Sequence, residues 1–174
     1  MTQKPQINPK PQRQSLPAEA SETKQKQESV KTDMTADLKM LQTIKNLPEK
    51  LLRNYEIRDL VDQAKEFGEY LKNIDLKTNQ IRKFLDALNR LKVLLAQDKE
   101  QKFSTIETEV VLLKPKLAYA VARKEDDRRT NPVKPLSDVL SEAINKVKDT
   151  EDFYRLVQLV ESIIAYHKAA GGKN

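Results

Sequence analysis

The sequence predicts an all-α protein: a single compact bundle of about five to six helices over residues 33–170, preceded by a disordered N-terminal tail. Three observations support this fold class. Apolar residues recur at helical spacing through most of the chain, no segment alternates apolar and polar residues as a half-buried strand does, and the 174 residues include only three glycines. Charged residues make up 33% of the chain beside 38% hydrophobic residues, a balance that favours long, solvated helices over a sheet.

Residues 1–32 are predicted to form the disordered tail. This segment is rich in Gln, Lys, Pro and Ser, and only Ile7, Leu16 and Val30 offer branched apolar surface. Such a composition cannot offset the entropy lost on ordering the chain. The favoured interpretation is a flexible tail without a specific role, and the alternative is a weak basic arm on nucleic acid. Residues 171–174 are predicted to be a short C-terminal tail.

The bundle is predicted to begin with two successive helical stripes between Asp33 and Leu71. Pro48 ends the first stripe and can open the second, because the first position of a helix needs no N–H donor. Gly68 lies within the second stripe and should cost about 1 kcal/mol relative to alanine, unless a neighbouring helix needs the close approach. The stripes consist of Met34, Leu38, Leu41 and Ile44, and of Leu51, Leu52, Tyr55, Leu60, Val61, Ala64, Phe67 and Leu71.

The next predicted helix covers residues 78–97, with Thr78 as its N-cap. Its apolar stripe is unbroken and its other side is polar. Asp86 and Arg90 have the spacing of a favourable ion pair, which contributes only a few tenths of a kcal/mol. The apolar stripe consists of Ile81, Phe84, Leu85, Leu88, Leu91 and Leu95, and the polar side of Arg82, Lys83, Asp86, Asn89 and Arg90.

The stretch 110–123, VVLLKPKLAYAVAR, is predicted to be the helix around which the function is organised. At 100° per residue, Lys116, Ala120 and Arg123 fall on one stripe, and the opposite side is apolar and fit for a core. Two long cations therefore lie about two turns apart on one face. Tyr119 lies at the edge of this stripe. We interpret it as a half-buried core phenol, with stacking on a base as the alternative.

This helix is predicted to be interrupted at its proline. Pro115 lacks a backbone N–H and disfavours helical geometry at Lys114. We therefore expect a kink or a restart, with Pro115 opening the second segment. Ser104 and Glu107 have the spacing of a capping box ahead of the first segment.

The remaining chain predicts an exposed connection over residues 124–135, a short helix and a long last helix. Thr150 is the predicted N-cap of the last helix, and Gly171 ends it. His167 continues its apolar stripe and is interpreted as a packed or capping histidine. The short helix is marked by Leu136, Val139, Leu140, Ala143, Ile144 and Val147, and the last one by Phe153, Leu156, Val157, Val160, Ile163 and Ile164.

Composition and motifs argue against an enzyme, and no catalytic residue, metal site or cofactor is predicted. The chain has no cysteine and a single histidine, so neither a thiol nucleophile nor a histidine-based metal cluster is available. Glu125, Asp126 and Asp127 are interpreted as a solvated charge run. No apolar run approaches a membrane span of about 20 residues, and no signal peptide is apparent. We expect a cytoplasmic protein.

The surface cations are the remaining functional candidates. The formal net charge is +6 with a pI near 9.3, which is compatible with an anionic partner. Arg82, Lys83 and Arg90 on one helix lie off the apolar stripe, and so do Lys116 and Arg123 on another. Rigid helices with spaced cations suit contact with phosphates, because each neutralised phosphate releases counterions whatever the base sequence. The alternative is that these side chains are simply solvated.

Three segments carry a resemblance to a known family. They read TNQIRKFLDALNRL, LLKPKLAYAVAR and FYRLVQLVESIIAYHK, and their order and spacing resemble the small subunit of the type III-A CRISPR–Cas effector, the Csm complex. The similarity runs from about Leu76 to Lys168. Each short motif alone is weak, but three in order are fairly specific.

The resemblance implies a non-catalytic helical subunit with a role in antiviral defence. Several copies of the subunit would stack on one another along the effector. Its other protein partners would be the backbone subunit and the large subunit. The basic face would contact the backbone of guide RNA and target RNA without reading sequence. Carried over by motif position, the predicted RNA-binding residues are Arg82, Lys83, Lys116 and Arg123, with Arg90 and Lys114 in second rank.

Two other classes of protein remain alternatives. A structural helical adaptor would bind partner proteins only and would leave the cations solvated. A basic peripheral-membrane module fits poorly, because no helix combines a strongly basic face with exposed Trp or Phe anchors.

Overall fold

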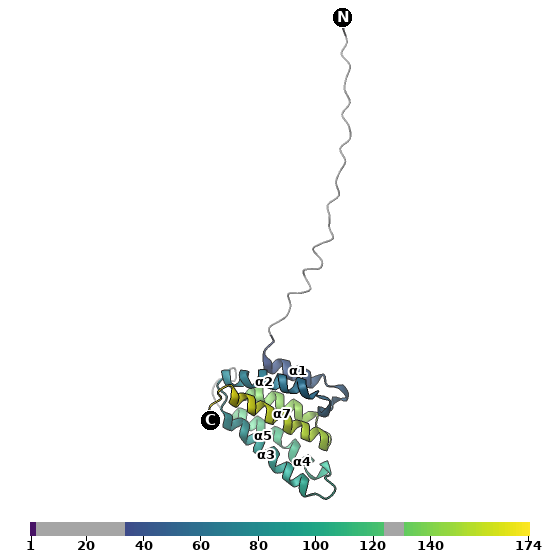
Figure 1. Cartoon of the computed structure of the whole chain (residues 1–174), viewed down its shortest axis with the longest axis vertical. Coiled ribbons are helices and arrows are strands. Elements are labelled where there is room, and N and C mark those ends of the chain that lie inside the picture. The colour runs from purple at the N-terminus through teal and green to yellow at the C-terminus, as the bar shows by residue number, and fades with distance from the viewer. Residues whose placement is uncertain (3–33, 124–130) are drawn as a thin grey trace. The chain divides into compact units, whose positions relative to one another are not determined.

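The computed structural model describes residues 1–2, 34–123 and 131–174. Contacts divide the chain into two units, Met1–Asp33 and Met34–Asn174, and the second unit is the helical domain considered below. The predicted tail therefore lies outside the described residues apart from its first two. Residues 124–130, which hold the predicted acidic run and most of the predicted connection, also lie outside them (Figure 1).

The described part of the chain contains helices and no strand, so the predicted all-α bundle is confirmed (Figure 1). Helices α4 and α5 are separated only by Leu112 and can be regarded as one interrupted helix. Short 3₁₀ turns cover Pro48–Lys50, Leu52–Asn54 and Phe103–Thr105. The α-helices are α1 (Ala36–Lys45), α2 (Ile57–Asn73), α3 (Thr78–Gln97), α4 (Glu107–Val111), α5 (Leu113–Ala122), α6 (Val133–Asn145) and α7 (Thr150–Ala169).

Helix α7 is central to the packing of the domain. It packs against α2 and α3, while α1 packs on α2 and α6, and α5 packs on α6 (Figure 1). The predicted buried face of this last helix is confirmed, since Phe153, Leu156, Val160 and Ile163 are each 0% exposed. Each such side chain stabilises the fold by about 1.5–3 kcal/mol through burial.

Gly68 is the site of a close approach between α2 and α7. A Cβ atom at this position would lie 2.7 Å from the backbone nitrogen of His167 and 3.1 Å from the carbonyl oxygen of Ile163. Both atoms belong to the backbone of α7, so they cannot move aside without shifting the helix. The expected reason for a glycine inside α2 is therefore confirmed.

His167 is packed in the interior, as predicted. Its imidazole is 0% exposed. Nε2 lies 2.9 Å from the carbonyl oxygen of Leu76, to which it donates, and Nδ1 lies 3.3 Å from Oγ1 of Thr78. Burial lowers the pKa of His167, the hydrogen bond to Leu76 opposes this shift, and the nearby charge of Lys168 adds to it.

The stability of the domain is expected to fall as pH drops below about 6.5, the pKa of an unperturbed histidine. Because the pKa of His167 is lowered in the folded state, the unfolded chain takes up a proton that the folded chain resists. The loss is at most about 1.4 kcal/mol per pH unit. Urea unfolding at several pH values between about 7.5 and 5.5 measures this change in the free energy of unfolding. Most carboxylates titrate below this pH range and contribute little to the change. His167→Gln should lack this dependence, and an equal slope in that variant would contradict the assignment.

Two predicted N-caps are wrong by one residue. Helix α3 begins at Thr78, so Lys77 is its N-cap, and the Thr78 hydroxyl is buried beside His167. Helix α7 begins at Thr150, and the Asp149 carboxylate accepts two N–H groups of the first turn at 3.0 and 3.1 Å. A carboxylate caps a helix as well as a hydroxyl does, and here it precedes the predicted residue.

The predicted stripe of the first helix is wrong in half of its members. Met34 and Leu38 are 46% and 49% exposed, whereas Met40 and Ile44 are buried. Helix α1 packs on α2 and α6, and its buried residues are Met40 and Ile44. The buried face of α1 therefore passes through Met40 and Ile44, which are four residues apart, and does not include Met34 or Leu38.

The helix boundaries near the prolines also differ from prediction. Pro48 opens a 3₁₀ turn and not α2. The predicted restart near Pro115 is present, but the break lies at Leu112, because Pro115 has no N–H to donate to the carbonyl group four residues earlier. The capping box of Ser104 and Glu107 is absent, since α4 has no side-chain cap.

Candidate nucleic-acid interface

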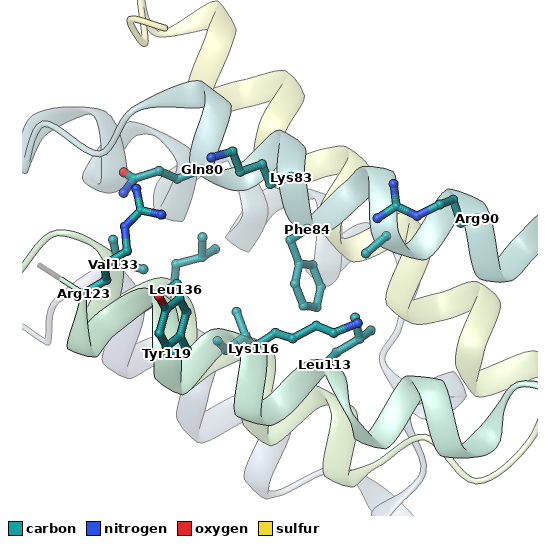
Figure 2. Close-up of a pocket in the computed structure, with 13 residues that line it drawn as sticks. Gln80, Lys83, Phe84, Arg90, Leu113, Lys116, Tyr119, Arg123, Val133 and Leu136 are labelled. Carbon is teal, nitrogen blue, oxygen red and sulfur yellow. The ribbon is translucent and has the colours of Figure 1, made fainter.

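A groove of about 450 Å³ runs between α3 and α5, and α6 contributes to its floor (Figure 2). We call it the α3–α5 groove. Its lining residues are Gln80, Lys83, Phe84, Ala87 and Arg90 from α3, Leu113, Lys116, Leu117, Tyr119, Ala120 and Arg123 from α5 and its end, and Val133 and Leu136 from α6.

The same residue pattern faces the groove from both helices. On α3, Lys83 is followed by Ala87 and Arg90, and on α5 a lysine, an alanine and an arginine recur at the same spacing, at positions 116, 120 and 123. Residues four and seven positions apart lie on one face of an α-helix. Each helix therefore presents two cations with a small side chain between them.

The floor of the groove is apolar. Phe84 is 8% exposed, and Leu117 and Leu136 are 5% and 2% exposed. These side chains belong to the hydrophobic core and also line the groove. Helix α5 is held against α6 by this apolar side, which fixes the direction in which its cations project.

Four cations surround the groove, and we call them the groove cations: Lys83, Arg90, Lys116 and Arg123. All four are exposed. Figure 2 shows two of them on each side, with Arg123 extending towards Gln80 of α3. None of them forms an ion pair with another described residue, and the predicted pair of Asp86 and Arg90 is likewise absent. Such an unbalanced positive cluster attracts polyanions.

Two predicted RNA-binding residues lie elsewhere. Arg82 is exposed on α3 but does not line the groove. The Lys114 ammonium donates to Oδ1 of Asn145 at 2.7 Å, which joins α5 to α6. The structure thus brings together four of the six predicted residues. The RNA-binding role of all six stays a prediction.

Tyr119 does not lie where the sequence interpretation put it. Its side chain is 67% exposed, so the prediction of a half-buried core phenol is wrong. Leu113 and Leu117 of α5 are buried in the core, whereas Tyr119 lies at the rim of the groove (Figure 2). Sequence reasoning also missed Gln80 and Ala87. The available signal was their helical spacing from Lys83.

Within the described ranges, no group of three or more His, Asp or Glu side chains is placed to hold a metal ion. No described helix has the length and apolar character needed to cross a membrane.

Comparison with known proteins shows the family to which the chain belongs. The family described as Csm2 Type III-A matches residues 54–173, well over half of the chain and all of the α3–α5 groove. The chain belongs to this family. The predicted resemblance to the small subunit of the type III-A Csm complex is confirmed. A curated relative, the CRISPR system Cms protein Csm2 of Streptococcus thermophilus, is 32% identical over 109 residues, which cover 62% of this chain and 79% of the relative. No solved structure matches the chain.

Because it belongs to the Csm2 family, the chain is a small, structural subunit of a type III-A CRISPR effector complex, which also contains other subunits.

Proposed function

We propose that this Csm2-family chain is a non-catalytic subunit that holds the sugar–phosphate backbone of RNA in the α3–α5 groove, without sequence specificity. The observation that carries the proposal is the set of groove cations, which are exposed, unpaired within the described chain and fixed on two packed helices. Each cation that neutralises a phosphate releases counterions from the RNA, and this gain does not depend on the bases.

The ligands of the groove are guide RNA and target RNA within the effector complex. Base pairing between the two strands supplies the specificity, and the protein contributes contacts to the backbone. One copy offers few phosphate contacts, so useful affinity arises when several copies stack along one strand beside the backbone and large subunits. The subunit thereby supports antiviral defence in the cytoplasm.

The chemistry of the described residues supports a non-catalytic role. The single histidine of the chain is buried and hydrogen-bonded at both ring nitrogens. The sequence has no cysteine. The groove is lined by lysine, arginine, glutamine, tyrosine and apolar side chains, which suits binding of an anion and offers no carboxylate as a general base.

A tagged pull-down from the native host, with the bound RNA sequenced and the proteins identified, tests this function. We expect short guide RNAs that share a repeat-derived 5′ end, together with a large and a backbone subunit. Partner proteins recovered without RNA would contradict the proposal and would make the chain a structural adaptor.

A further inference from the structure

We propose that the α3–α5 groove also seats one unstacked base of single-stranded RNA, with Tyr119 as the stacking ring. This inference rests on the proposed function, because it assigns the kind of RNA that the groove accepts. It starts from the combination of an apolar floor, a cationic rim and an exposed aromatic ring in one groove.

Tyr119 is the first observation. Its ring is 67% exposed, and its hydroxyl forms no hydrogen bond within the described chain. Aromatic side chains usually bury most of their large surface. A ring left open at the rim of a groove is therefore available to a ligand, and every base offers a flat face for such a ring.

The space between the cations is the second observation. Ala87 and Ala120 stand between the two cations of their respective helices. An alanine has no side chain beyond Cβ, so the middle of the groove remains open above Phe84. A contact with phosphates alone needs only the rim, whereas an open apolar centre suits a flat, weakly polar group.

The two features together match a nucleotide in a single strand. Its phosphates are anionic and its base is flat and largely apolar, and backbone and base are joined at fixed distance. In a duplex the bases are stacked and paired, which hides their faces from a protein. An unpaired base can leave the stack and enter the groove while the neighbouring phosphates stay at the groove cations.

The test measures binding of the full chain to three labelled RNAs at low salt. The first is an unstructured single strand, the second is a strand of the same length that is abasic at every position, and the third is a blunt duplex. We expect the first to bind about tenfold more tightly than the abasic strand, since stacking on an aromatic ring supplies a gain of this order. The charges of these two strands are equal, so the difference reports the bases.

Four variants make the assignment specific. Tyr119→Ala should remove the preference for the intact strand and leave the salt dependence unchanged, whereas Tyr119→Phe should keep both. Ala120→Leu fills the centre of the groove and should act like Tyr119→Ala. Val111→Ala removes an exposed apolar side chain outside the groove and should have no effect. Circular dichroism confirms that each variant is folded.

Two results would overturn the inference, and they differ from failure of the proposed function. Equal affinity for the intact and abasic strands, or an unchanged preference in Tyr119→Ala, removes the base from the groove while RNA binding stands. Absence of salt-dependent binding to all three RNAs removes the proposed function together with the inference.

Discussion

Replacing all four groove cations by alanine is expected to abolish most of the salt-dependent RNA binding of the chain. Each phosphate contact on a single strand contributes about −0.7 to the slope of log affinity against log salt. Four contacts therefore predict that wild-type affinity falls about 50-fold between roughly 50 and 200 mM salt. The variant should show little of this dependence. Binding to a labelled single strand across a salt series measures both slopes.

A matched control variant distinguishes the effect of the groove cations from the effect of lowering the net charge of the chain. Four other exposed cations lie outside the groove and form no ion pair with a described residue: Lys45, Arg58, Lys65 and Lys92. Their replacement by alanine removes the same charge and should change the slope far less. If both variants lose the dependence equally, general charge and not the groove binds the RNA.

Asp152→Ala is expected to destabilise the domain by about 2–4 kcal/mol. The carboxylate is 0% exposed. One oxygen accepts the backbone N–H of Arg53 at 2.8 Å, and the other accepts that of Lys148 at 2.9 Å. The Arg53 guanidinium lies 3.7 Å from it. Alanine would leave both part-buried N–H groups without their acceptor, which is the cause of the expected loss.

Urea or thermal unfolding measures this loss. Asp86→Ala is the control, because Asp86 is exposed on α3 and forms no ion pair among the described residues. Its effect should stay within about 0.5 kcal/mol. Asp152→Asn keeps one acceptor oxygen, so its loss of unfolding free energy should lie between those of Asp152→Ala and Asp86→Ala. An unfolding free energy for Asp152→Ala within about 1 kcal/mol of wild type would contradict the role assigned to the carboxylate.

The face of α5 could be predicted from sequence because helical spacing alone fixes it. Once residues 113–122 are a helix, Lys116 and Arg123 must project from one side. The same holds for Lys83 and Arg90 on α3. What the sequence did not provide is that these two faces meet across one groove, since this depends on how α5 packs on α6 and how α3 packs on α7.

Tertiary context also explains the errors. The core prediction for Tyr119 rests on the rule that aromatic rings are usually covered, but its ring lies at the rim of the α3–α5 groove and is 67% exposed. The burial of Asp152 was not predicted either, because it depends on a turn almost a hundred positions earlier that places Arg53 against the carboxylate. Contacts of such separation leave no periodic signal in the sequence.

The central claim, that RNA lies in the α3–α5 groove, is tested most directly by ultraviolet cross-linking of RNA in the assembled effector complex. Cross-linked peptides of this subunit are identified by mass spectrometry. We expect them to come from α3 and α5 and to include Tyr119, the exposed aromatic ring at the rim. Cross-links confined to α1, α2 or α7 would contradict the claim and would place the RNA on another surface.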